Sequence, residues 1–151
     1  MLTKYLRSLM VAALLLPSLG HASPVTAGPG MNLPAPEAYQ MMSQGELTVI
    51  DIRRPEEWRQ TGIAKDAIRI NMLHPEGAAG FLGEVLRTVD GNRDAPIGLI
   101  CRTGNRTTQV QRFLVAQGFT QVYNIREGMA GSGSGPGWLR RGLPVDPCRN
   151  C

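Results

Sequence analysis

Short apolar stretches alternate along this chain with stretches of helical character, and this alternation most constrains the fold. The expected strands cover residues 47–50, 67–70, 97–100 and 121–125. The expected helices cover residues 36–44, a segment starting at Pro55, residues 81–86, and residues 107–117 before a stop at Gly118. Strands that alternate with helices indicate an α/β domain with a mainly parallel sheet. Because the strands are apolar throughout, we expect both faces of the sheet to be covered.

Two residues of chemical interest directly follow expected strands. Asp51 follows the first strand, and Cys101 follows residues 97–100. Ligands of open parallel sheets bind at the carboxyl ends of the strands, so this edge is the predicted site. Arg53 stands two residues after Asp51. We interpret Asp51 and Arg53 as an ion pair and turn cap that hold the strand end, in preference to a direct catalytic role.

The segment after Cys101 joins an expected strand to an expected helix within a few residues. Such a loop aims successive backbone N–H groups inward, and a nest of this kind at a helix N-terminus binds an anion. Gly104 suits a position of positive φ, and Thr107 is the expected N-cap. The residues expected to hold the anion are Arg102, Thr103, Gly104, Asn105, Arg106 and Thr107. These donors favour a thiolate and predict that Cys101 is a nucleophile. The alternative is that Cys101 is a small buried apolar residue.

The chain resembles a known family, the single-domain rhodaneses, over roughly residues 35 to 145. The loop Cys101–Thr107 resembles that family's active-site loop. Further matches are Asp51-Ile52-Arg53 with Glu56-Glu57-Trp58, Val122-Tyr123-Asn124-Ile125 with Gly128, and Trp138 with Gly142-Leu143-Pro144-Val145. The resemblance implies a rhodanese-like α/β fold with a five-stranded, mainly parallel sheet flanked by helices. It also implies a persulfide on Cys101 and thiosulfate as a typical sulfur donor.

The chain departs from the family pattern at two places. Asp66 stands where glycine is usual, which leaves the conformation of that turn open. A glycine-rich insert covers residues 131–137, and the sequence assigns it no role.

The spacing of the loop distinguishes two chemistries. Cys101 and Arg106 form a Cys-x4-Arg motif, whereas the cysteine phosphatases that it also resembles use Cys-x5-Arg. The shorter loop favours a sulfurtransferase that moves sulfane sulfur from a donor such as thiosulfate to cyanide or a thiol. The alternatives are a sulfur-carrier or binding module without turnover and, less favoured, a thiol phosphatase or arsenate reductase. A Cys–His protease is disfavoured because His74 is interpreted as a surface residue.

The first 22 residues have the pattern of a secretory signal peptide. Lys4 and Arg7 precede an apolar run that is too short for a comfortable membrane span, and small residues end at Ala22. We therefore expect a signal peptide at 1–22, a flexible leader at 23–34, a rhodanese-like domain at 35–146 and a tail at 147–151. The resemblance is greatest to small exported rhodaneses of the phage-shock type, which predicts a periplasmic protein without stable membrane association after cleavage.

The charge of the exported chain gives no reason to expect a nucleic-acid partner. Loss of Lys4 and Arg7 lowers the basic count from 16 to 14 against 12 acidic residues, so the net charge falls from +4 to +2. Aromatic residues make up 5% of the chain and do not interleave with a basic cluster. The expected partners are a small anionic sulfur donor and a thiol or cyanide acceptor.

Cys148 and Cys151 form a Cys-x-x-Cys motif at the end of the sequence. Haem attachment requires a following histidine, and zinc requires two further ligands, so neither a metal nor another cofactor is expected. In an oxidising compartment the expected state is a disulfide between the two residues. The alternative is a mobile dithiol that reaches a persulfide on Cys101.

Overall fold

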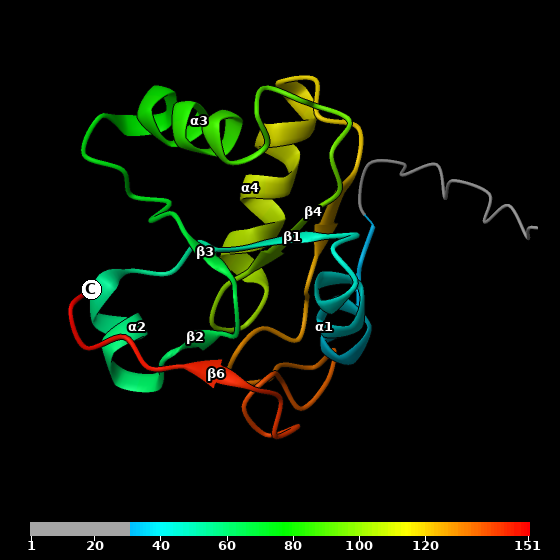
Figure 1. Cartoon of the computed structure of the whole chain (residues 1–151), viewed down its shortest axis with the longest axis vertical. Coiled ribbons are helices and arrows are strands. Elements are labelled where there is room, and N and C mark those ends of the chain that lie inside the picture. The colour runs from blue at the N-terminus through cyan, green and yellow to red at the C-terminus, as the bar shows by residue number, and fades with distance from the viewer. Residues whose placement is uncertain (1–30) are drawn as a thin grey trace, which may run out of the picture.

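A parallel sheet of four strands forms the centre of the structure, a computed structural model that describes residues 31–151 (Figure 1). The strands are β1 (Thr48–Asp51), β3 (Ile68–Arg69), β4 (Ile97–Ile100) and β5 (Val122–Asn124), in the order β3-β1-β4-β5. Asp51 lies opposite Ile100 on one side and Arg69 on the other, so three strands end in one row. The predicted α/β class with a mainly parallel sheet and flanking helices is confirmed. The predicted signal peptide and the leader up to residue 30 lie outside the described residues.

The strand count differs from the five strands that the resemblance implied. A parallel bridge between Asn32 and Asn124 occupies the place of a fifth strand beside β5. The Leu33 N–H donates to the Asn124 carbonyl at 2.9 Å, and the next residue, Pro34, has no N–H to continue the ladder. The last residues of the expected leader are therefore paired with the sheet. A separate antiparallel pair consists of β2 (Ile63–Ala64) and β6 (Val145–Asp146).

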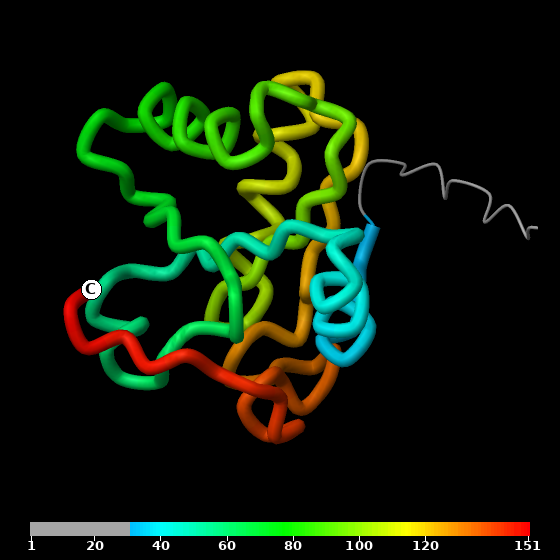
Figure 2. The backbone as a smooth tube through the Cα atoms, viewed as in Figure 1, coloured from blue at the N-terminus to red at the C-terminus, as the bar shows by residue number. Residues whose placement is uncertain are grey.

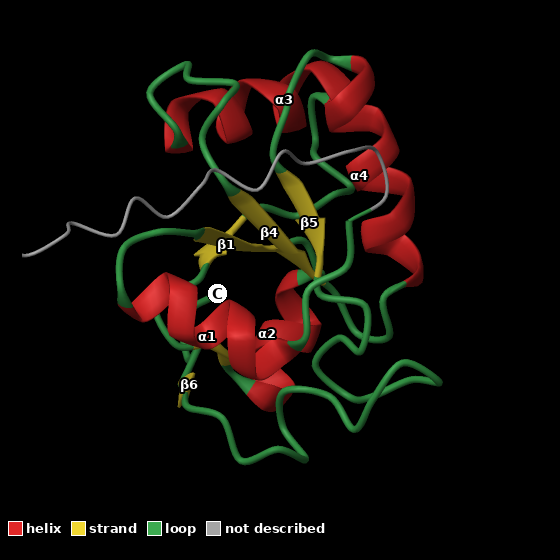
Figure 3. Cartoon of the chain, turned by 90° about the vertical axis from the view of Figure 1, so that its right-hand side faces the viewer, coloured by secondary structure: helices red, strands yellow, loops and turns green. Residues whose placement is uncertain are grey.

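Helices cover the sheet on both faces (Figure 3). One face carries α3 (Gly77–Thr88) and α4 (Asn105–Ala116), and the other carries α1 (Ala35–Ser43) and the segment that follows β5. The strands alternate between these two cores. Ile50, Leu99 and Val122 pack toward α3 and α4, whereas their neighbours Val49, Ile100 and Tyr123 pack toward α1. This double coverage explains why the strands are apolar without a polar face.

The turn containing Asp66 takes a left-handed conformation, with φ of 61°. Glycine adopts this conformation without strain, and aspartate is one of the few other residues that tolerate it. The Asp66 N–H donates to Oδ2 of Asp146 in β6 at 2.9 Å. The turn therefore keeps the geometry of a glycine position and is held by the closing strand.

Glu127 fixes the glycine-rich insert. Its buried carboxylate accepts hydrogen bonds from the N–H groups of Ala35 and Gly137, both at 2.8 Å, and from Nε of Arg141 at 2.7 Å. One side chain thus joins the start of α1 to the insert and to the closing segment. These partners, above all the Arg141 guanidinium, lower the pKa of the carboxyl group against the opposing effect of burial.

The C-terminal tail runs past β6 along α2 (Pro55–Thr61), as the red end of the tube shows (Figure 2). Cys148 packs there with Trp58 and Ile63, and Cys151 lies against the same cluster. None of the helices found in residues 31–151 has the length and hydropathy of a membrane span.

Candidate functional site

The loop after β4 is locked in place by the chain that follows β5. The N–H groups of Met129 and Ala130 donate to the carbonyls of Cys101 and Arg102 at 2.8 and 2.9 Å. Gly104 has φ of 85°, and a Cβ there would collide with the Arg126 carbonyl. These contacts pack two backbones so closely that only glycine fits at residue 104. The sequence predicted this glycine requirement but did not identify residues 126–130 as the opposing wall.

The Cys101 thiol lies at the bottom of this loop with 1% of the residue exposed. The Gly104 N–H points at its Sγ, at 3.2 Å, and the Thr107 hydroxyl lies 3.6 Å away. Both donors belong to the turn that opens α4, where the first N–H groups have no intrahelical acceptor. The thiol is therefore surrounded by groups that stabilise negative charge on sulfur.

Helix α4 begins at Asn105, two residues before the start that the sequence predicted. Gly104 is the N-cap, so the expected capping role of Thr107 is wrong. Thr107 lies inside the first turn, fully buried, and its hydroxyl donates to the Gly104 carbonyl at 2.8 Å. That carbonyl also accepts from the Thr108 hydroxyl at 2.9 Å. The Thr107 hydrogen can consequently turn to a Cys101 thiolate without leaving the carbonyl unpaired.

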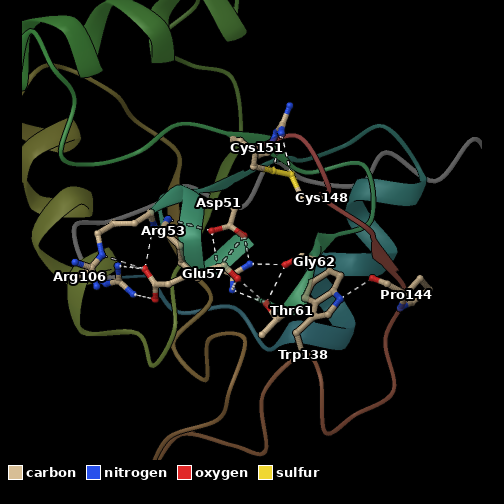
Figure 4. Close-up of polar contacts among 12 residues, drawn as sticks. Asp51, Arg53, Glu57, Thr61, Gly62, Arg106, Trp138, Pro144, Cys148 and Cys151 are labelled. Atoms are coloured by element: carbon tan, nitrogen blue, oxygen red, sulfur yellow. Dashed lines mark hydrogen bonds and ion pairs between the residues drawn. A yellow bond between two sulfur atoms is a disulfide. The ribbon is translucent and has the colours of Figure 1, made fainter. Parts of the chain in front are cut away.

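Arg106 forms a two-pronged ion pair with Glu57 of α2, with nitrogen–oxygen distances of 2.6 and 2.7 Å (Figure 4). The Arg106 guanidinium lowers the pKa of Glu57 from 4.5 to about 2, and it outweighs the opposing effect of burial. The same hydrogen bond raises the pKa of Arg106. The sequence analysis expected Arg106 to help hold an anion, and the structure pairs its charge with a carboxylate 49 residues away.

Arg102, Thr103 and Asn105 complete the loop and are more accessible than Cys101. Arg102 and Asn105 are exposed and Thr103 is half-buried. Arg102 belongs to none of the ion pairs found among residues 31–151, so its charge faces solvent. Within the loop it is therefore the cation best placed to meet an incoming anion.

Asp51 and Arg53 form a buried ion pair beside the loop. Arg53 is 2% exposed, and its Nη2 lies 2.7 Å from Oδ2 of Asp51, which is fully buried. Arg53 also donates to the Thr61 hydroxyl at 2.8 Å and to the Gly62 carbonyl at 2.7 Å. The pair thus holds both the end of β1 and the end of α2, and it makes no contact with the thiol.

Glu57 and His74 make contacts that the sequence interpretation did not predict. Glu57 lies in a helix start that the sequence indicates. No sequence pattern predicts its pairing with Arg106, because the two residues are far apart in the chain. His74 is half-buried, contrary to the surface position expected for it. Its ring nitrogen accepts a hydrogen bond from the Glu76 N–H, and the ring faces Glu84.

No cluster of three His, Cys, Asp or Glu side chains suited to a metal ion occurs in residues 31–151.

A buried thiol on a strand–loop–helix turn at the carboxyl edge of a parallel sheet defines an α/β protein with a cysteine-centred loop. The family model described as Rhodanese-like domain matches residues 34–132. The chain belongs to that family.

Similar proteins agree with this assignment. An uncharacterised protein of Rickettsia prowazekii is 28% identical over 75% of this chain and 94% of its own length. A protein of Allochromatium vinosum named sulfurtransferase is 31% identical over 66% of this chain and 78% of its own length. The crystal structure of Rv0390 from M. tuberculosis has a TM-score of 0.63 at 24% identity, covering 80% of this chain and 99% of that one. The structural likeness shows the fold.

Glu57→Gln is expected to destabilise the protein by about 1–2 kcal/mol at pH 7, after allowance for partial exposure of the pair. The folded-state pKa of Glu57 is depressed, so its contribution is present above about pH 4.5 and is lost as the pH falls toward 2. Urea unfolding of both proteins between pH 7 and 3 measures the difference. Glu56→Gln is the control because that exposed carboxylate touches only Arg54. An equal loss at pH 7 and pH 3 would contradict this role for the ion pair.

Thr107→Val is expected to slow alkylation of Cys101 by iodoacetamide about threefold to tenfold, because it removes a donor to the thiolate. Thr107→Ser retains the hydroxyl and should react at nearly the wild-type rate. Thr88→Val is the matched control, since it also loses a hydroxyl bond to a backbone carbonyl, that of Glu84, but lies in α3. Peptide mapping at pH 7 measures the rates. Wild-type reactivity in Thr107→Val would remove Thr107 from the thiol's environment.

Proposed function

We propose that this chain is a sulfurtransferase that carries sulfane sulfur as a persulfide on Cys101. The observation that supports it most directly is the short loop in which the Gly104 N–H and the Thr107 hydroxyl face Sγ. The donor is an anion such as thiosulfate, and the acceptor is cyanide or a thiol. The relationship to a protein named sulfurtransferase supports the same reaction class.

The reaction has two displacement steps at Cys101. The thiolate attacks the outer sulfur of thiosulfate, the sulfur–sulfur bond of the donor breaks, and sulfite leaves with the bonding electron pair. Cyanide or a thiolate then attacks the outer sulfur of the persulfide, which releases thiocyanate or a new persulfide and restores the Cys101 thiolate. The N–H groups of the loop stabilise the negative sulfur in both steps.

The two arginines of the loop have different tasks in this proposal. Arg102 attracts the anionic donor from solvent, because its side chain is exposed and unmatched by a carboxylate. Arg106 holds the first turn of α4 to α2 through Glu57, which keeps the N–H groups of that turn directed at the sulfur. The first acts on encounter with substrate, and the second acts on the geometry of the site.

We further propose that the protein is exported and works in the periplasm. The support is the signal-like pattern of residues 1–22 and the resemblance to exported, phage-shock-type rhodaneses. The acceptor there is a thiol-bearing molecule. A sulfur-carrier module without turnover is the second candidate, and a rate measurement distinguishes it from an enzyme.

Cys101→Ser is expected to abolish sulfur transfer from thiosulfate to cyanide, because a serine hydroxyl forms no persulfide. The wild-type protein should gain the mass of one sulfur atom when treated with thiosulfate, and the variant should not. Intact mass spectrometry and thiocyanate formation measure the two properties. Wild-type turnover in the variant would overturn the proposed nucleophile, while loading without turnover would identify a carrier.

Arg102→Ala is expected to raise KM for thiosulfate about twofold to fivefold at low salt, with a smaller effect at high salt where exposed charges are screened. Arg106→Ala should lower kcat at either salt concentration, because it frees the first turn of α4. Arg112→Ala, on the exposed side of the same helix, is the control for loss of one charge. Steady-state kinetics at two ionic strengths measure these effects. Equal, salt-independent changes in Arg102→Ala and Arg112→Ala would contradict attraction by Arg102.

A further inference from the structure

The tail disulfide meets a cation that comes from a distant part of the chain. Cys148 and Cys151 are joined by a disulfide, and Nη1 of Arg69 lies 2.9 Å from Sγ of each. The Arg69 guanidinium carbon also lies 6.0 Å from the centre of the Trp58 ring. Figure 4 shows the disulfide between Cys148 and Cys151. The sulfurs are therefore seated between a strand end and α2, although they belong to the tail.

The contact with Arg69 favours the reduced pair more than the disulfide. Disulfide sulfurs are neutral and accept hydrogen bonds weakly. A thiolate formed by reduction carries a full negative charge, and a hydrogen bond between a guanidinium and an anion is about twice as strong as a neutral one. A cation beside a cysteine stabilises its thiolate and makes that thiolate a better leaving group.

The disulfide contributes little as a structural cross-link. The two cysteines are three residues apart, so their bond closes a very short loop. A cross-link of this span restricts the unfolded chain much less than a long-range bridge does. The tail is held to the domain by other contacts: β6 pairs with β2, Cys148 packs on Trp58, and the Arg59 guanidinium donates to the Cys151 carbonyl.

The sulfur pair can also be reached from solvent. Cys151 is half-buried, whereas Cys148 is 9% exposed. An open pocket of about 440 Å³ lies between the end of α2 and the tail, and Cys148, Arg59 and Arg149 are among the residues that line it. The two arginines give this side of the disulfide a positive charge that attracts an approaching thiolate, and the half-buried Cys151 is the more exposed of the two sulfurs it meets.

We propose that Cys148 and Cys151 form a thiol–disulfide exchange site, that Arg69 stabilises the departing thiolate, and that the partner is a dithiol reductant. This site is separate from the sulfur-transfer chemistry of Cys101 and does not depend on it. The more accessible Cys151 is the sulfur attacked, and the more buried Cys148 is the leaving group beside Arg69.

The exchange balances with a dithiol as the only co-reactant. One thiolate of the reductant attacks Sγ of Cys151, the Cys148–Cys151 bond breaks, and Cys148 leaves as a thiolate. The second thiol of the reductant, once deprotonated, attacks its own sulfur in the mixed disulfide and releases Cys151. Two electrons pass to the protein, the reductant becomes a disulfide, and the two protons of the dithiol end on the protein thiols or in solvent.

The test uses the full chain with Cys101→Ser, so that only the tail cysteines react. Dithiothreitol is added under native conditions, and alkylation of samples taken with time gives the reduction rate by mass spectrometry. We expect complete reduction without denaturant. Arg69→Gln should slow it about threefold to tenfold, because Cys148 loses its stabilising cation.

Two further variants and one further measurement make the result specific. Arg69→Lys keeps a positive charge and should retain most of the rate, which separates the role of charge from damage to the edge strand. Arg149→Gln removes a charge between the two cysteines without removing a contact to sulfur, and should slow reduction less than Arg69→Gln. In the reduced proteins, the pH dependence of alkylation should show a higher apparent pKa for the more reactive thiol in Arg69→Gln.

Two outcomes would overturn the proposal. A disulfide that dithiothreitol reduces only in denaturant would be a structural clip with no exchange function. Equal reduction rates in the Cys101→Ser parent and in its Arg69→Gln and Arg149→Gln derivatives would show that Arg69 has no part in exchange. Neither outcome affects sulfur transfer at Cys101, which is measured separately with thiosulfate and cyanide.

Discussion

The buried ion pair between Asp51 and Arg53 is the interaction on which the rest of this sheet edge depends. A buried charge is tolerated only when it is paired and its remaining hydrogen-bonding groups are satisfied. Arg53 meets that condition by donating to Asp51, to the Thr61 hydroxyl and to the Gly62 carbonyl. The arrangement therefore fixes both the position of α2 and the direction in which the chain leaves it toward β2.

The position of α2 supports two contacts through consecutive residues of the helix. Glu57 holds Arg106 and with it the first turn of α4, whereas Trp58 packs against Cys148 in the tail. A single short helix thus supports both sulfur-containing sites of the described chain. Its start is stabilised by Pro55 at the first helical position and by the hydrogen bond from the Arg54 N–H to the Glu57 side chain.

The sequence predicted those features of the fold and the site that depend on residues close together in the chain. The apolar runs and helix signals located the central strands and the four helices of residues 31–151 to within a few residues, because periodicity and stop signals act over short distances. The loop spacing and Gly104 identified the candidate nucleophile for the same reason. The predicted helix start at Thr107 was wrong because Gly104, in the left-handed conformation, takes the N-cap position instead. Two long-range contacts had no signal in the sequence. Arg106 pairs with Glu57, 49 residues away, and Arg69 contacts the tail sulfurs, about 80 residues away. No local or periodic pattern of residues indicates contacts over such distances.

The distribution of charge explains how such a loop handles a negative sulfur. Arg53 and Arg106 each face a carboxylate, so the side-chain charge next to the loop is largely balanced. The positive potential at Cys101 then comes chiefly from backbone N–H groups at the start of α4, together with the exposed Arg102. Fixed dipoles of this kind suit negative charge on Sγ of Cys101 or on the outer sulfur of the proposed persulfide. The two chemistries differ in the group held on Cys101: a persulfide adds a single sulfur atom, whereas a cysteinyl phosphate adds a phosphoryl group with two charges and three oxygens. Since Glu57 already pairs with both prongs of the Arg106 guanidinium, little unmatched side-chain charge remains there for a cysteinyl phosphate, which supports the proposed sulfur transfer alongside the short loop.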